Sequence, residues 1–402
     1  MTGAPAEPSR AAEIGRSYDV VPYDPGPHGG LGLAQVRGAA AALGVAVSSG
    51  PVLDVLDIGC GTGAQLLHAA AESQGRMVGI DASAEACGRA RALGAPLGGR
   101  WTILHGDAAG ADAAALGRFD VVYLLGTLYI MPPAARAQAL SLAAACLKPG
   151  GVVVMNYYAG LAGLARAALG RILRLGNDPT WPVAQQLSTV RANLKAIGDA
   201  VPAQGPTRDL VMGTLASMGR TGDVVMFHEA LGPVLETLHT AELATRLAAE
   251  DVRFVNYIPP APMPLGADPK VAARTAEAWD FASGGGYRTA LFARPCDGGG
   301  GNGLRHPALV WATALQRSGD AAVFMVPGGA GIQAQSRLAQ ATIAALIEGP
   351  SGWTALRARV SARLASTDAA APVGADAIDA GIDDMLMTLW RQGVAAPALP
   401  VG

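Results

Sequence analysis

The 402-residue sequence has few aromatic residues and little charge. Aromatic residues make up 5% of it and charged residues 15%, with a formal net charge of −2. So small a net charge gives no general attraction to nucleic acid or to an anionic membrane surface. The sequence is instead rich in small and apolar residues, with 53 glycines and 50% hydrophobic residues. This length and this apolar content predict a large core divided over two or three domains.

Cysteine is also scarce, and long apolar runs are absent. The four cysteines, Cys60, Cys87, Cys146 and Cys296, form no C-x-x-C pair. We therefore expect free thiols in a reducing compartment and no metal site. Residues 1–8 lack the basic and apolar regions of a signal peptide, and no stretch of about 18 apolar residues is uninterrupted. These absences predict a soluble, cytoplasmic protein without membrane contact, and they leave its oligomeric state unknown.

The most informative segment that is present is Asp57-Ile-Gly-Cys-Gly-Thr-Gly63. It follows the apolar residues 51–56 and precedes the helix-like residues 64–71. Glycines permit a tight turn and let the backbone touch a ligand, so a strand, this turn and a helix predict a nucleotide site. Gly59, Gly61 and Ala64 satisfy the G-x-G-x-x-A fingerprint of dinucleotide-binding enzymes. An NAD-dependent oxidoreductase is therefore one interpretation.

Asp57 favours a different ligand. A carboxylate beside a pyrophosphate is repelled, whereas S-adenosyl-L-methionine (SAM) carries an ammonium and a sulfonium and has no phosphate. Four further strand-like segments follow in order at residues 76–81, 101–107, 119–125 and 147–155, and the last begins with Leu147-Lys-Pro-Gly-Gly151. This series resembles the class I SAM-dependent methyltransferases. The resemblance implies an α/β fold with a Rossmann-like sheet, and SAM as the cofactor.

The resemblance also implies a set of cofactor-binding residues. The residues of the glycine turn are expected to bind the methionine end of SAM. The residues after the second and third strands are expected at its ribose and adenine, and the residues after the fourth strand beside its methyl group. In chain order they are Asp57, Gly59, Cys60, Gly61, Gly63, Asp81, Ala82, Asp107, Ala108, Leu125 and Gly126. Cys60 is interpreted as a small residue that fits beside the cofactor, and not as a nucleophile.

Segments outside the cofactor site resemble one subgroup of this family. These are Tyr18-Asp-Val-Val-Pro-Tyr23, Asn156-Tyr-Tyr-Ala-Gly160, His228-Glu-Ala-Leu-Gly-Pro-Val234 and Tyr287-Arg-Thr-Ala-Leu291. They are similar to bacterial methyltransferases that carry a methyltransferase regulatory domain, which include protein lysine methyltransferases. The chain departs from that pattern at residues 125–130, Ala159 and Leu235, where acceptor specificity is usually set.

Three functions that depend on SAM binding therefore stay open, beside the NAD-dependent oxidoreductase. The first is methyl transfer to the lysine amine of a protein or peptide. The second is transfer to nitrogen or oxygen of a small molecule or natural product, and the third is a SAM-binding regulatory protein without catalysis.

Methyl transfer is an in-line displacement that depends on position, and an amine acceptor must arrive neutral. An aromatic wall that excludes water favours the neutral amine. The candidate catalytic residues for that wall are Tyr18, Tyr23, Tyr129 and Tyr158, with Tyr157 as a further candidate. His228 and Glu229 are expected to have a structural role at a helix start.

The organisation predicted for the chain has five parts. An N-terminal lid segment spans 1–30 and the SAM-binding domain 31–160. A mainly helical regulatory domain spans 161–294, and a Gly-rich linker 295–303 leads to a C-terminal domain, 304–402. Helices expected at 342–346, 354–365 and 379–392 make a winged-helix arrangement possible there, but the segment has few basic residues, so we expect no nucleic-acid binding.

Overall fold

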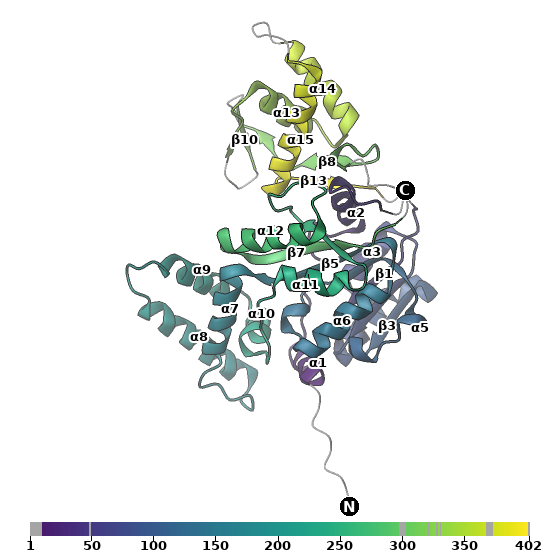
Figure 1. Ribbon diagram of the computed structural model, residues 1–402. Coiled ribbons are helices and arrows are strands. Elements are labelled where there is room, and N and C mark those ends of the chain that lie inside the picture. The colour runs from purple at the N-terminus through teal and green to yellow at the C-terminus, as the bar shows by residue number, and fades with distance from the viewer. Residues whose placement is uncertain are drawn as a thin grey trace, which may run out of the picture.

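The computed structural model describes residues 10–47, 50–296, 303–319, 322–326, 329, 331–366 and 373–400. Its centre is a seven-stranded sheet in the order β3-β2-β1-β4-β5-β7-β6 (Figure 1). Strands β1 to β5 are parallel, and β7 runs antiparallel to both of its neighbours. This order confirms the predicted Rossmann-like α/β fold. The strands are β1 Val55–Ile58, β2 Met77–Asp81, β3 Trp101–His105, β4 Phe119–Leu124, β5 Leu147–Ala159, β6 Arg253–Tyr257 and β7 Gly286–Ala293.

Both faces of this sheet are covered, because successive residues of its apolar strands point to opposite sides. Val55, Val121 and Val152 pack in the same core as α2 (Leu33–Ala42), α3 (Ala64–Glu72) and α4 (Ala84–Gly94). Their neighbours Leu56 and Val122 pack with α6 (Pro133–Ala145), α11 (Thr240–Ala248) and α12 (Pro269–Ala282) on the other face. Shorter elements connect the strands: η1 Ala95–Arg100, η2 Ala108–Gly110, α5 Ala113–Leu116 and η3 Leu128–Ile130.

The helices between β5 and α11 form a unit with a small core of its own, which we call the helical module. It comprises α7 (Gly160–Leu173), α8 (Val183–Ala200), α9 (Arg208–Gly219), α10 (Asp223–Met226) and the π-helical turn η4 (Phe227–Leu231). Leu169, Leu173, Val190, Leu215 and Met218 belong to its apolar cluster. Figure 1 shows the module beside the sheet.

The sheet continues after the helical module. Sequence reasoning ended the SAM-binding domain at about residue 160 and assigned residues 161–294 to a mainly helical domain. In the structure, β6 and β7 return to the sheet next to β5, and α11 and α12 cover one face of it. Buried β7 residues such as Leu291 and Phe292 pair with Val154 and Val153 of β5. The helical module is therefore an insertion between strands of one sheet.

The C-terminal residues fold against α2. They form the sheets β12-β8-β13 and β11-β10-β9, together with three longer helices and η5. Leu399 N donates to Ala34 O at 2.8 Å, and a Cβ on Gly38 would lie 2.6 Å from Ala398 Cα, so the backbones of α2 and β13 touch. The winged-helix arrangement stays a prediction, and residues 297–302 of the predicted linker lie outside the described residues. The elements are η5 Gly303–Arg305, β8 Val310–Thr313, β9 Gln316–Arg317, β10 Val323–Met325, β11 Gly331–Gln333, α13 Arg337–Ile347, β12 Ser351–Gly352, α14 Trp353–Ala365, α15 Ala375–Arg391 and β13 Ala395–Ala398.

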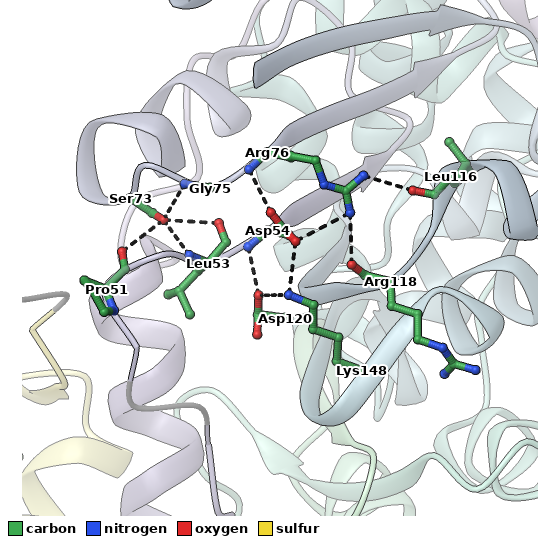
Figure 2. Close-up of polar contacts among 10 residues, drawn as sticks. All are labelled: Pro51, Leu53, Asp54, Ser73, Gly75, Arg76, Leu116, Arg118, Asp120 and Lys148. Carbon is green, nitrogen blue, oxygen red and sulfur yellow. Dashed lines mark hydrogen bonds and ion pairs between the residues drawn. The ribbon is translucent and has the colours of Figure 1, made fainter. Parts of the chain in front are cut away.

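A polar network fixes the strands at their amino ends (Figure 2). Lys148 Nζ lies 3.0 Å from Asp54 Oδ2 and 2.8 Å from Asp120 Oδ2, and Asp54 N donates to the same Asp120 oxygen at 2.8 Å. Burial alone raises the pKa of Asp54, but hydrogen bonds from Arg76 N and Lys148 outweigh it and lower that pKa overall. Asp120 and the lysine of the Leu-Lys-Pro-Gly-Gly segment therefore have a structural role, at the ends of β1 and β4 where those strands begin.

Candidate active site

A pocket lies at the other ends of these strands, where β1, β2 and β4 finish. Its volume is about 1420 Å³, including the space at its mouth that is open to solvent. It brings together residues from the glycine turn, from the loops after β2, β3 and β4, and from the N-terminal segment. Thirteen of the fifteen predicted site residues line it: Tyr18, Tyr23, Asp57, Gly59, Cys60, Gly61, Asp81, Ala82, Asp107, Ala108, Leu125, Gly126 and Tyr129.

The three glycines of the turn have different tasks. All have positive φ angles, +84° at Gly59, +52° at Gly61 and +82° at Gly63. A Cβ on Gly59 would lie 2.0 Å from Thr127 Cγ2, and one on Gly63 would lie 3.0 Å from the ring of Trp101. A Cβ on Gly61 meets no described atom within 4 Å. Gly59 and Gly63 are therefore needed for packing, whereas Gly61 leaves space for a ligand. Gly63 was expected at the methionine end of the cofactor, but it is not among the residues that line the pocket.

Asp57 carries an unmet hydrogen-bond acceptor in this pocket. Its side chain is 2% exposed, and among the described residues nothing donates to its Oδ1. Burial, reinforced by the charge of Asp81, raises the pKa of Asp57 to about 8. The hydroxyl of Thr127, which also lines the pocket, has no partner in the described part of the chain either. A buried acid of this kind fits a cationic ligand that brings N–H donors.

Asp81 ties the end of β2 to the glycine turn. Its Oδ2 accepts from Gly61 N at 2.8 Å and its Oδ1 from Ser83 N at 2.9 Å. Burial raises the pKa of Asp81 overall, although these two hydrogen bonds oppose the rise. Asp107 is similarly held, because its Oδ1 accepts from Ala109 N and Gly110 N at 2.8 and 3.1 Å. Both carboxylates are thus fixed by backbone amides at the pocket wall.

Cys60 is buried beside these acids. Burial first, and then the charges of Asp81 and Asp57, raise the pKa of its thiol well above the ordinary value. A nucleophilic cysteine needs the opposite shift. The environment therefore agrees with the interpretation of Cys60 as a small residue in the pocket wall.

Aromatic rings line the rest of the pocket in two groups. Tyr18 stacks on His228 with centroids 3.9 Å apart and planes at 7°, and Tyr23 meets both rings edge-on. In the second group, the ring of Tyr158 lies 4.9 Å from that of Tyr129 and 5.0 Å from that of Tyr287. Tyr129 and Tyr287 line the pocket, but Tyr158 does not. Tyr158 therefore supports the wall from behind.

The remaining tyrosine candidate lies elsewhere. Tyr157 is fully buried, and its hydroxyl is 2.8 Å from Thr240 Oγ1, which in turn is 2.6 Å from the hydroxyl of Tyr257. Successive residues of β5 point to opposite faces, so Tyr157 and Tyr158 cannot share one wall. Tyr157 belongs to the core under α11.

Sequence reasoning missed the roles of Tyr287, which lines the pocket, and of Glu229, which holds Tyr158 from behind the aromatic wall. Tyr287 is the second residue of β7, and only the pairing of β7 with β5, which sets Tyr287 opposite Tyr158, shows where it lies. Glu229 accepts the Tyr158 hydroxyl at 3.0 Å and Arg166 Nε at 2.7 Å, while both charged side chains are buried. The His228-Glu229 pair was visible in the sequence, but its partners were not.

Comparison with known proteins agrees with this geometry. A model of the methyltransferase domain family matches residues 55–151, from β1 into β5. The protein is a SAM-dependent methyltransferase. Two solved structures of PKMT2 from Rickettsia typhi, one in complex with AdoHcy, match with TM-scores of 0.74 and 0.75 at 15% identity, over 94% of this chain and 77% of theirs. At that identity the likeness shows a common fold. A search of curated protein sequences finds no match.

The pocket of this methyltransferase fits its cofactor, SAM. The unpaired Oδ1 of Asp57 suits the cofactor's ammonium, the open face of Gly61 leaves room for close backbone contact, and Asp81 and Asp107 are held at the ends of β2 and β3. When bound, SAM supplies an electrophilic methyl group on sulfur. Within the described residues no group of three or more His, Cys, Asp or Glu side chains could hold a metal ion, and no helix is long and apolar enough to cross a membrane.

Proposed function

We propose that this methyltransferase transfers the methyl group to the amine of a lysine side chain in a protein or peptide. The observation that carries the proposal is the tyrosine-lined chamber next to the cofactor residues, made by Tyr18, Tyr23, Tyr129 and Tyr287. A lysine side chain is long and thin enough to reach into an aromatic chamber, and ring faces attract an ammonium.

The chamber also suits the chemistry of an amine acceptor. An ammonium has no lone pair, so the proton must leave before the in-line displacement, and a chamber that excludes water lowers the pKa of the amine. Tyr129 is buried and Tyr18 is half-buried. Burial raises the pKa of both phenols, so these hydroxyls stay protonated and orient the nitrogen by hydrogen bonding. The aromatic walls hold the nitrogen in line with the sulfur–methyl bond.

The comparison supports the same choice. PKMT2, a protein lysine methyltransferase, shares the fold over 94% of this chain, including the helical module and the C-terminal part. The helical module meets the chamber through His228, which stacks on Tyr18, and it offers a macromolecular acceptor contact area outside the pocket.

The test is to incubate the purified protein with SAM carrying a labelled methyl group and a library of lysine-containing peptides. Acid hydrolysis and chromatography then identify the labelled amino acid. The proposal expects methylated lysine, and lysine-to-arginine peptides should stay unlabelled. Label in small molecules of a cell extract, with none in peptides, would favour the natural-product function. Tight SAM binding without any labelling would favour the regulatory protein.

A further inference from the structure

The N-terminal residues 14–28, which we call the strap, cross the pocket between the sheet and the helical module. Tyr18, Pro22 and Tyr23 of the strap line the pocket. Figure 1 shows α1 (Arg10–Val20), which contains the first part of the strap, at the end of the molecule opposite the C-terminal domain. A Cβ on Gly15 would lie 2.5 Å from Ala82 O, so the helix touches the loop after β2.

Several hydrogen bonds join the strap to the sheet side of the pocket. Asp19 Oδ1 accepts from Ser83 Oγ at 2.6 Å and from Glu85 N at 3.1 Å, at the amino end of α4. Asp24 Oδ1 accepts from Thr62 Oγ1 at 3.0 Å, in the glycine turn. These contacts hold the strap at Asp19 and at Asp24, and they leave the segment between these two residues to be held from elsewhere.

His228 of the helical module holds that middle segment. Its Nε2 lies 2.7 Å from Val21 O. Because a carbonyl only accepts, Nε2 carries the proton of this bond. The same ring stacks on Tyr18, and the side chain is 5% exposed. His228 lies in η4, a π-helical turn, and such turns are frequent at functional sites.

We propose that His228 is a positioning residue that holds the strap closed over the bound cofactor. The helical module, and not the sheet alone, then sets how long SAM or its product stays in the pocket. The imidazole touches neither reacting atom. It acts through Tyr18 and Val21, whose positions depend on it. This role concerns cofactor exchange and does not depend on which acceptor is methylated.

Two variants separate the hydrogen bond from the ring contact. His228→Phe keeps a ring against Tyr18 but removes the N–H donor, whereas His228→Gln removes the ring but keeps an N–H donor near the position of Nε2. The measured quantity is the dissociation rate of S-adenosylhomocysteine from the full-length protein, followed by chase of the radiolabelled compound. Loss of one buried hydrogen bond changes an equilibrium by roughly tenfold. We therefore expect dissociation to be about tenfold faster in His228→Phe and only a few-fold faster in His228→Gln.

A second readout reports on the strap itself. Hydrogen exchange of residues 14–28, measured with S-adenosylhomocysteine bound, should become faster in His228→Phe, while exchange in α7 to α9 stays unchanged. His239→Phe is the matched control, because His239 is an exposed histidine whose Nδ1 pairs with Glu277 at 2.8 Å, away from the strap. Its dissociation rate should equal that of the wild type.

The two readouts decide the proposal together. Faster dissociation with faster exchange in the strap supports it. Unchanged dissociation, faster dissociation with an unchanged strap, or equal rates in His228→Phe and His228→Gln would overturn it. None of these measurements needs a methyl acceptor. Failure to methylate lysine would therefore contradict the proposed function without affecting the conclusion about His228.

Discussion

The hydroxyl of Tyr158, near the end of β5, donates to Glu229 Oε1 in the π-helical turn at 3.0 Å, across 71 residues of sequence. The other carboxylate oxygen of Glu229 accepts from Arg166 of α7. The side chains of Arg166 and Glu229 are 7% and 10% exposed. Tyr158 in turn packs against the pocket residues Tyr129 and Tyr287, so one buried ion pair joins the helical module to the aromatic wall.

The first prediction concerns this ion pair. Glu229→Gln leaves the Arg166 guanidinium buried without a counter-charge, and breaking a buried pair in this way costs about 3–5 kcal/mol. The free energy of unfolding, measured by urea denaturation with circular dichroism, should fall by that amount. Asp223→Asn is the control, because it breaks the exposed pair with Arg191, and such pairs contribute at most about 1 kcal/mol. Equal losses in the two variants would show that the Glu229 pair is not effectively buried.

A second prediction separates the two roles of glycine in the turn. In Gly59→Ala the new methyl group meets Thr127 Cγ2 at 2.0 Å, so stability should fall by about 1–3 kcal/mol from overpacking, with added strain from the positive φ. Gly61→Ala should fold with a smaller loss, but its methyl group enters the cofactor space. SAM affinity measured by calorimetry should then fall at least tenfold.

Gly98→Ala is the control for backbone strain in this comparison. Gly98 has φ +60°, and its Cβ would meet nothing within 4 Å, as at Gly61, but it does not line the pocket. Its SAM affinity should equal that of the wild type. If Gly61→Ala also binds SAM normally, the cofactor does not approach this part of the turn.

The cofactor side of the site could be predicted from the sequence because its signals are local. Asp57, Gly61, Asp81 and Asp107 each follow an apolar run, and the carboxyl ends of neighbouring parallel strands meet at one edge of a sheet. Chain order was therefore enough to bring them together. Gly63 was expected beside the cofactor but is not among the residues that line the pocket. A positive φ is needed equally for a turn and for ligand contact, and only the distance from Gly63 to Trp101 indicates a packing role.

The acceptor side could not be predicted in the same way because it depends on long-range packing. Tyr287 reaches the chamber through antiparallel pairing of β7 with β5, and nothing near it in the sequence indicates that neighbour. Glu229 was assigned a structural role at a helix start, since adjacent helical residues point apart. That divergence is what lets His228 hold the strap while Glu229 holds Tyr158.

A third prediction concerns the network at the opposite ends of the strands. Lys148→Met removes the ammonium between Asp54 and Asp120, and we expect a loss of about 1–2 kcal/mol in unfolding free energy with unchanged S-adenosylhomocysteine affinity. The folded-state pKa of Asp54 is lowered, so its contribution is present above the ordinary value of about 4 and is lost as the pH falls through the folded value. The difference between variant and wild type should therefore shrink below about pH 4. A constant difference down to pH 2 would contradict this assignment.

The last prediction concerns proton release when SAM binds. Burial and the charge of Asp81 raise the pKa of Asp57 to about 8, so at pH 7 the pocket without ligand holds mainly the neutral acid. A cation beside Oδ1 favours the carboxylate, which must then lose its proton on binding. SAM affinity should rise with pH from 6 to 8, by up to about tenfold per unit.

Titration calorimetry in two buffers measures that proton directly. At pH 7, the heat of SAM binding should differ between phosphate and Tris, because the two buffers take up a released proton with different enthalpies. Asp57→Asn isolates the contribution of Asp57. This variant should bind SAM more weakly at pH 8 and release fewer protons per SAM bound. Its SAM affinity should lose most of its dependence on pH between 6 and 8. Identical heats in the two buffers for the wild-type protein would mean that Asp57 is already ionised before SAM arrives, and that its unmet oxygen is not the partner of the ammonium.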